Sequence, residues 1–210
     1  MEIVRLVLTH SKIFFDDVAQ LHIAEIHHGV LPLLGKDFLS RIYFELTRAP
    51  RSGVWCAIES GRVVGFLAGC GDMRASCLSV LYRGHLPLAL LASRSVFKAG
   101  VLGKILTVFR YTFHSTRQAL NQTLKETAQP HAELLALAVE QSVRGRGVGR
   151  MLVQKFEESL LGWGVVGSYC VATNINDPHS NAFYEALGFA ACGSMEHNNL
   201  TLQIYEKKVT

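Results

Sequence analysis

A loop rich in glycine and arginine carries the clearest chemical signal in the sequence. It reads Arg144-Gly145-Arg146-Gly147-Val148-Gly149-Arg150 and lies between an apolar stretch and an amphipathic one. Such a place is typical of a strand that passes into a helix. Glycines leave backbone N–H groups uncovered there, and the partial positive charge of a helix N-terminus adds to the charge of the arginines. The loop is therefore predicted to bind a pyrophosphate.

Two common nucleotide-binding loops do not fit this segment. A Walker loop requires Lys-Ser or Lys-Thr after its last glycine, and neither pair follows here. The dinucleotide fingerprint G-x-G-x-x-G fails because the third glycine, Gly149, comes one residue early. A turn that needs flexible residues explains one or two glycines, but not three that alternate with three arginines.

Strands and helices that could position this loop follow from the apolar patterning. The uncharged run 134–139 predicts a buried strand covered on both faces, and the stripe Met151, Leu152, Phe156 and Leu160 predicts a helix after the loop. Further strands are expected at 3–8, 54–58, 63–69, 165–173, 189–192 and 201–205.

Helix boundaries are predicted from capping residues. Asp16 or Asp17 would start a first helix that ends at Gly29, and a second would run from about Asp37 to the Ala49-Pro50 break. Another helix would begin at Asp177-Pro178 and end at Gly188. Helices are also expected at 86–97 and 102–120.

Two motifs in this order resemble the GCN5-related N-acetyltransferase (GNAT) superfamily. Arg144, Gly147 and Gly149 match its R/Q-x-x-G-x-G/A motif, and the segment 181–189, NAFYEALGF, is similar to its FYxxLGF motif. The resemblance implies an α/β (α+β) GNAT fold: a central mixed, mostly antiparallel twisted sheet flanked by helices. Residues 1–210 would form a single N-acetyltransferase domain.

The same resemblance implies an enzyme that uses acetyl-CoA as its acyl donor. The acetyl group would pass to a primary amine by direct attack in a ternary complex, without a metal. Leu137, Ala138 and Val139 would contact the pantetheine, and 144–150 would hold the pyrophosphate. Many relatives have Asn and Ala where this chain has Asp177 and Ser180, so the coenzyme contact is expected to come from Asn174, Asn176 or Asn181 instead.

Tyr184 and Glu133 are the catalytic candidates. By resemblance, Tyr184 protonates the departing thiolate, and its alternative is a core aromatic that shares a helix face with Leu187. Glu133 opens the apolar strand, where burial would raise the pKa of a carboxyl as a general base requires. A solvent-facing or substrate-binding glutamate is the alternative. His27 and His28 are rival bases.

A basic segment separates the third expected strand from the fourth. Residues 73–125 contain eight Lys or Arg and no Asp or Glu, within a chain whose net charge is +4. We interpret 73–130 as a helical insertion that serves as a dimer interface or lid, or contacts an anionic partner. Its aromatic residues are spaced for a helix and not for a strand platform, which argues against a nucleic-acid partner.

Composition limits the class of protein. Hydrophobic residues make up 49% of the 210 residues and charged residues 18%, which is typical of a globular chain. No segment long enough to span a bilayer and no signal peptide are evident, so the expected location is the cytoplasm, with a peripheral membrane contact as an alternative. The five cysteines form no C-x-x-C pair and are expected to be reduced and mostly buried.

The acceptor stays open at this stage. An amino sugar or sugar nucleotide and a peptide or protein amine are the candidates for an enzyme. A non-catalytic CoA-binding regulatory module is the alternative from another function class.

Overall fold

A mixed seven-stranded sheet organises the computed structural model, which describes residues 1–26, 31–96, 132–197 and 200–209. Side chains are described for these residues except 85–96 and 197. The strand order is β1-β2-β3-β4-β5-β7-β6, and every neighbouring pair is antiparallel except β4 and β5. The expected mixed, mostly antiparallel sheet flanked by helices is therefore confirmed. Its strands are β1 (Glu2–Arg5), β2 (Ser52–Glu59), β3 (Arg62–Cys70), β4 (Ala132–Val139), β5 (Ser168–Asn174), β6 (Ala190–His197) and β7 (Leu200–Lys208).

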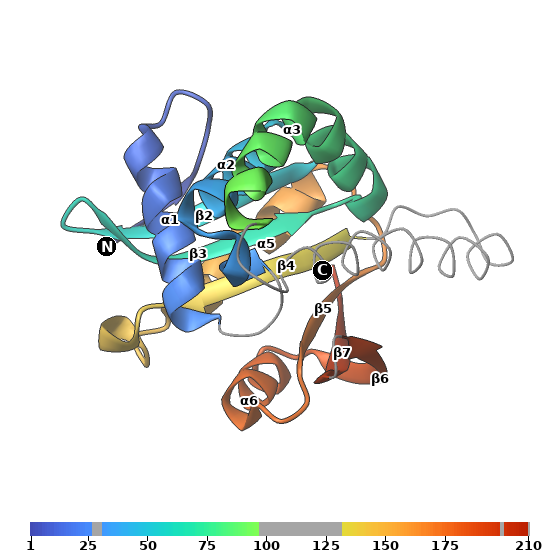
Figure 1. Ribbon diagram of the computed structural model, residues 1–210. Coiled ribbons are helices and arrows are strands. Elements are labelled where there is room, and N and C mark those ends of the chain that lie inside the picture. The colour runs from blue at the N-terminus through green and yellow to red at the C-terminus, as the bar shows by residue number, and fades with distance from the viewer. Residues whose placement is uncertain (27–30, 97–131, 198–199, 210) are drawn as a thin grey trace, which may run out of the picture.

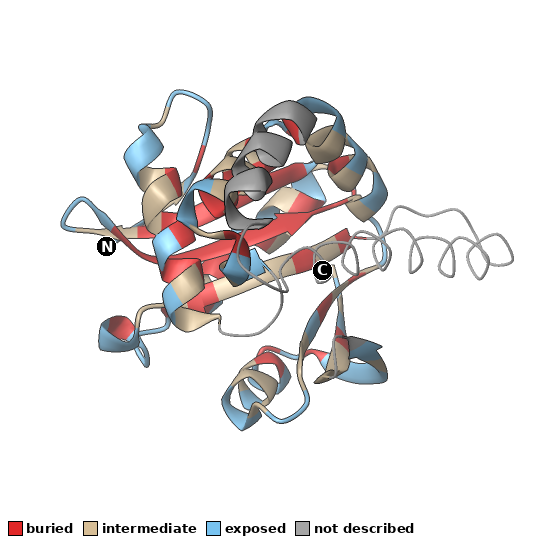
Figure 2. Ribbon diagram, viewed as in Figure 1, coloured by how far each residue is buried: buried red, intermediate tan, exposed pale blue. Residues whose placement is uncertain are grey.

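Helices cover both faces of the sheet (Figure 1). One apolar cluster joins α1 and α2 to β2, β3 and β4, and a second joins α5 to the opposite face. Figure 2 places the buried residues along the strands between these layers. The predicted cover on both faces of β4 is thus present. The helices are α1 (Lys12–Glu25), η1 (Leu31–Leu34), α2 (Lys36–Arg48), α3 (Met73–Val96), η2 (Gln141–Val143), α5 (Val148–Gly162) and α6 (Pro178–Ala186).

The parallel strands β4 and β5 are paired over a short distance only. Their register joins Ala132 to Tyr169 and Leu134 to Val171, and stops there. From that point the strands diverge, and β5 continues toward α6, β6 and β7 (Figure 1). The C-terminal half of β4 therefore pairs with β3 but has no strand partner on its other edge among the described strands.

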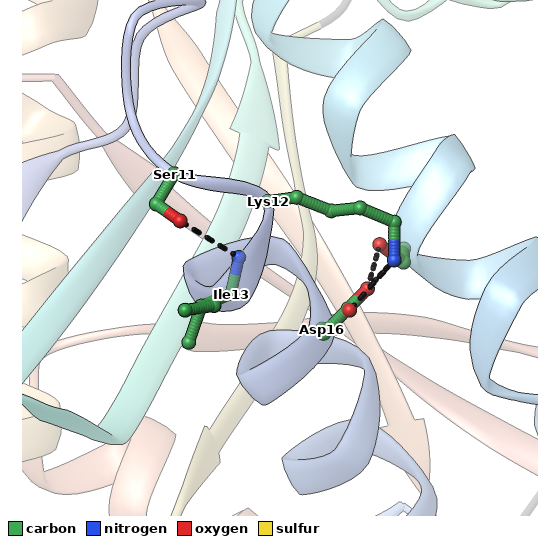
Figure 3. A network of polar contacts seen from close by, with 5 residues as sticks. Ser11, Lys12, Ile13 and Asp16 are labelled. Atoms are coloured by element: carbon green, nitrogen blue, oxygen red, sulfur yellow. Dashed lines mark hydrogen bonds and ion pairs between the residues drawn. The ribbon is translucent and has the colours of Figure 1, made fainter.

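The start of α1 differs from the expectation based on Asp16 and Asp17. Ser11 is the N-cap, and its side chain accepts a hydrogen bond from the Ile13 N–H at 3.3 Å (Figure 3). Asp16 lies one turn inside the helix, where it pairs with Lys12 at 2.7 Å and accepts a hydrogen bond from Ser40 of α2 at 2.6 Å. It joins two helices instead of capping one.

Helix α3 begins earlier than the apolar pattern indicated. It starts at Met73, not Leu86, because the Asp72 side chain accepts a hydrogen bond from the Ala75 N–H at 2.9 Å and so caps the first turn. The second helix expected in the basic segment, at 102–120, lies outside the described residues. No helix in the described part of the chain is both long enough and apolar enough to cross a membrane.

Candidate active site

The glycine-rich loop forms the N-terminus of α5. Gly145 and Gly147 both have φ of +76°, a left-handed conformation that favours glycine. Gly147 is the N-cap and provides no side-chain cap, and a Cβ atom placed on either glycine would meet open space. Within the described residues, the backbone N–H groups of 145–150 donate to no backbone carbonyl. The next N–H, that of Met151, donates to the carbonyl of Gly147 at 3.1 Å. The loop therefore presents free backbone donors to an anion, as its pattern predicted.

Gly149 has a different role from the other two glycines. It is buried in the first turn of α5, and a Cβ atom there would lie 3.0 Å from the ring of Phe183 in α6. A side chain at this position would require the ring of Phe183 to shift by a few tenths of an ångström. The third glycine of the motif therefore lies in close contact with a side chain of α6, unlike the two glycines before it.

Two of the loop arginines are held by carboxylates from distant parts of the chain. Arg144 forms an ion pair with Glu25 at the end of α1, and its Nε donates a 3.0 Å hydrogen bond to the carbonyl of Val139. Arg146 contacts both oxygens of Glu59, at 2.7 and 3.2 Å. Arg150 is exposed and forms no ion pair among the described residues. The sequence contained no signal for Glu25 or Glu59, because their partners lie 119 and 87 residues away.

The predicted pantetheine residues lie on the unpaired half of β4. Leu137, Ala138 and Val139 pair with β3 on one side, opposite Leu67, Phe66 and Gly65. A β-bulge precedes them, because Ala136 pairs with Ala68 while Leu134 pairs with Gly69, and Leu135 is left between. The bulge residue of a strand stays out of the ladder. Leu135 therefore lies outside both registers at the point where β4 and β5 separate, a feature that the apolar run did not reveal.

Glu133 lies one residue before Leu134 on β4 and faces the layer of α1, α2 and α3. Burial raises its pKa to about 7. Around it are the thiols of Cys70, Cys77 and Cys170, whose own pKa values are raised by burial and by the Glu133 charge. These thiols therefore stay protonated near neutral pH, and Glu133 is the group that titrates there. All five cysteines are free thiols: Cys56 and Cys70 are buried, Cys77 and Cys170 are partly buried, and Cys192 is exposed.

Tyr184 lies in the core between α6 and the sheet. Only 6% of it is exposed, and its ring packs 5.3 Å from Phe189 and 5.2 Å from Phe183, measured between centroids. Burial raises the pKa of its phenol. Leu187 is buried on the same helix face, as the alternative interpretation required. Tyr184 therefore packs as a core aromatic residue. Its role as a general acid stays a prediction.

Asn174 and Asn181 come together where β5 passes into α6. The Asn181 Nδ2 donates hydrogen bonds to the carbonyls of Asn174 at 3.2 Å and Ile175 at 3.0 Å, while its Oδ1 is buried without a hydrogen-bond partner. Asp177, which stands where many relatives have asparagine, caps α6: its side chain accepts hydrogen bonds from the backbone N–H groups of His179 and Ser180. The rival bases His27 and His28 lie outside the described residues. No cluster of three metal-ligating side chains occurs in the part of the chain that the structure describes.

Comparison with known proteins agrees with this arrangement. The model of the acetyltransferase (GNAT) family matches residues 21–189, which is more than half of the chain. No curated protein matches. A solved structure of aminoglycoside 6'-acetyltransferase type Ii is 16% identical, with a TM-score of 0.61 over 100% of this chain and 98% of that one.

Two further solved structures share the fold. An aminoglycoside 6'-N-acetyltransferase complexed with coenzyme A is 14% identical, with a TM-score of 0.60 over 100% of this chain and 98% of that one. The ribosomal-protein-S18-alanine N-acetyltransferase from Escherichia coli is 11% identical, with a TM-score of 0.58 over 100% of this chain and 94% of that one. At these identities the likeness establishes the fold. Together with the family match, it confirms that the chain belongs to the acetyltransferase (GNAT) family.

Proposed function

We propose that this protein transfers an acetyl group from acetyl-CoA to a primary amine by direct attack in a ternary complex. One observation carries the proposal: the unpaired edge of β4 is followed, after η2 and the glycine-rich loop, by the N-terminus of α5, which has no side-chain cap. Coenzyme A matches both features, because its pantetheine arm is an extended chain with amide groups and carries a pyrophosphate at one end. The backbone of 137–139 would pair with the pantetheine arm, and the N–H groups of 145–150 would bind the pyrophosphate.

The bulge at Leu135 supports a position for the thioester. Leu135 lies outside the register with β3, and its backbone N–H would donate to the carbonyl oxygen, on which negative charge develops as the amine attacks. The amine nitrogen forms a bond to the carbonyl carbon, and the bond from carbon to sulfur breaks. A fixed donor at this point stabilises the oxyanion without reorganisation.

Glu133 would accept a proton from the ammonium group of the acceptor, which leaves the neutral amine to attack. Its position two residues before the bulge places it at the same point of the sheet, and a pKa of about 7 suits a base at neutral pH. Tyr184 would return a proton to the thiolate. Its raised pKa keeps the phenol protonated until the leaving sulfur comes within hydrogen-bond reach.

An amino sugar or sugar nucleotide is the acceptor class that we propose first. Two solved structures of the same fold are named as aminoglycoside acetyltransferases. A peptide amine is the second candidate, since another is named for the alanine of a ribosomal protein. The two classes are separated by an acceptor screen and not by the fold.

Calorimetric titration of the purified chain with acetyl-CoA, desulfo-CoA and NAD tests the donor site. We expect both coenzyme forms to bind and NAD not to bind, and failure of both coenzyme forms would overturn the proposal. Thiol release with panels of amino sugars, sugar nucleotides and peptides then tests transfer. Binding of the coenzyme without release for any amine would favour the non-catalytic module.

A further inference from the structure

The first turns of α3 carry apolar side chains on two opposite faces. The inner face includes Met73, whose sulfur lies 3.9 Å from that of Cys70 in β3, and Val80, which packs against the cluster of α1 and α2. Leu78 and Tyr82 lie on the other side of the helix, its outer face, and are 56% and 81% exposed. Residues four apart are neighbours on a helix, so these two side chains form one apolar patch. Surface helices normally have a polar outer face, and such a patch marks a contact surface.

Arginines surround this apolar patch. Arg74 lies one turn before it and Arg83 directly follows it, and both are exposed. The Arg83 guanidinium donates a 3.0 Å hydrogen bond to the carbonyl of Arg48 at the end of α2, which holds it at the edge of the outer face. Arg51 is also exposed and lies beside the start of α3, because its carbonyl accepts a 2.7 Å hydrogen bond from the Gly71 N–H.

The positive charge of these arginines is not neutralised by carboxylates. Arg51, Arg74 and Arg83 form no ion pair among the described residues. Glu45 of α2 is fully buried and occupied by two other arginines of its own helix. The sequence has no Asp or Glu from 73 to 125, so the helix itself supplies no compensating charge.

An apolar patch with a basic rim matches the surface of an anionic lipid bilayer. Leu and Tyr side chains enter the boundary between headgroups and acyl chains, while Arg side chains extend along it and keep their charge among the phosphates. A protein partner would instead be expected to meet a pocket that accepts its anchoring side chain, and the outer face of a helix is convex. A bilayer adapts to a convex face.

We propose that the outer face of α3, around Leu78 and Tyr82, binds the surface of an anionic phospholipid bilayer. The protein would lie on the membrane without crossing it. Its coenzyme site would stay accessible, because α3 starts near Glu133 at the beginning of β4, whereas the glycine-rich loop follows the other end of that strand (Figure 1). The proposal goes beyond acetyl transfer and does not depend on it.

Vesicle flotation tests the proposal with the full chain. One set of vesicles contains phosphatidylcholine alone, and the other replaces a quarter of it with phosphatidylglycerol. We expect the chain to float with the anionic vesicles only and to be released in part by high salt. Equal binding to both sets, or to neither, would overturn the proposal.

The double variant Leu78→Gln with Tyr82→Gln tests the apolar patch. It should weaken binding to the anionic vesicles by roughly tenfold or more, since two large side chains no longer leave water. Leu161→Gln with Val166→Gln is the matched control, because these side chains are 51% and 79% exposed and lie at the end of α5. An equal loss in both double variants would contradict the assignment to α3.

Single charges test the basic rim. Arg74→Gln should weaken binding by about fivefold, as expected for one Arg near an anionic surface. Lys155→Gln lowers the net charge by the same amount at an exposed position of α5 and should have a smaller effect. Equal effects of the two variants would assign the binding to net charge alone and overturn the proposed orientation.

A reporter variant keeps the test informative where a glutamine variant is less stable. The fluorescence of Tyr82→Trp should be quenched by brominated phosphatidylcholine in anionic vesicles more strongly than that of the native chain, whose Trp55 and Trp163 lie with the cluster of α5. Vesicle binding without this added quenching would place the contact elsewhere on the chain. Binding to neither vesicle, with a dimer that the double glutamine variant dissociates, would replace the bilayer by a second copy. Failure to bind acetyl-CoA would overturn the proposed function alone.

Discussion

Arg144 of the glycine-rich loop and Glu25 of α1 form an ion pair across 119 residues of sequence. The same guanidinium donates to the carbonyl of Val139, the last residue of β4. One side chain therefore joins the end of α1, the end of β4 and the loop before α5. The proposed pyrophosphate would compete with Glu25 for Arg144.

Glu25→Gln should release Arg144 for the coenzyme. Because an exposed ion pair contributes about 0.2–1 kcal/mol, we expect acetyl-CoA to bind up to about fivefold more tightly. Calorimetry at low and high salt measures the effect. Glu140→Gln is the control, since it removes a carboxylate that pairs with Arg62 and not with the loop. Weaker binding in Glu25→Gln would mean that the ion pair holds Arg144 in its binding position.

Gly147→Glu should abolish coenzyme binding, because it places a side chain and a negative charge against the pyrophosphate. Gly164→Glu is a matched control at the other end of α5. Both glycines have positive φ, at +76° and +69°, and open space around a Cβ atom. Each variant therefore carries a similar backbone cost of about 1–2 kcal/mol. Retained coenzyme affinity in Gly147→Glu would exclude the loop as the binding site.

Glu133→Gln should lower turnover by roughly a hundredfold or more, as expected on removal of a general base. In the native chain, kcat/KM should rise with pH up to about 7 and then level off, since the base must be deprotonated. The thiols of Cys70, Cys77 and Cys170 do not account for that limb, because their pKa values are raised further. A pH–rate profile unchanged in Glu133→Gln would contradict the assignment.

The same raised pKa predicts an effect on stability. Because the folded state holds the Glu133 proton more tightly than the unfolded state, its contribution to folding is lost as pH rises from about 4.5 to about 7. Glu133→Gln should remove this part of the pH dependence. Thermal unfolding of both chains across that range measures the difference.

Tyr184→Phe should leave coenzyme binding and the core nearly intact, because phenylalanine fills the same space. If the phenol protonates the thiolate, turnover should fall by about a hundredfold. Tyr205→Phe is the control, since it removes a hydroxyl that donates to Glu185 at 3.0 Å. Unchanged turnover in Tyr184→Phe would leave Tyr184 as a core aromatic only.

His22 predicts a loss of stability in acid. It is 4% exposed, hydrogen-bonded to Tyr43, and burial lowers its pKa to about 4. The unfolded state binds a proton more readily, so stability should fall as pH drops from about 6.5 to about 4, by on the order of 3 kcal/mol. His22→Gln should show a smaller loss over this interval in chemical denaturation. An equal loss in both chains would assign the effect to other groups.

Local sequence signals predicted much of the fold because their physical causes are local. Asp177 caps α6, Pro178 occupies its first turn, and Gly188 follows its end with φ of +84°. The hairpin turns at Gly61, and the loop before α5 adopts positive φ at the expected glycines. Each depends on the conformational preference or hydrogen bonding of a few consecutive residues.

Predictions failed where a neighbouring element changed the role of a local signal. Asp16 resembles a cap, yet Ser40 of α2 donates a hydrogen bond to it and Ser11 caps α1 instead. Asp72 starts α3 well before the apolar stretch that suggested a helix at Leu86. Several residue types can cap a helix. The position of each side chain relative to the free N–H groups of the first turn decides which one does, and residue type alone does not show this.

By itself, the sequence determined the strand–loop–helix unit around 144–150, the order of the elements and the membership of a family. Tertiary structure decided which residues from distant segments meet. The ring of Phe183 lies against Gly149, Glu25 pairs with Arg144, and strand register puts Glu133 and Glu206 in one row. These relationships depend on where the bulge at Leu135 falls and where β4 leaves β5. Both result from packing the whole sheet between its helices, and no short stretch of residues encodes them.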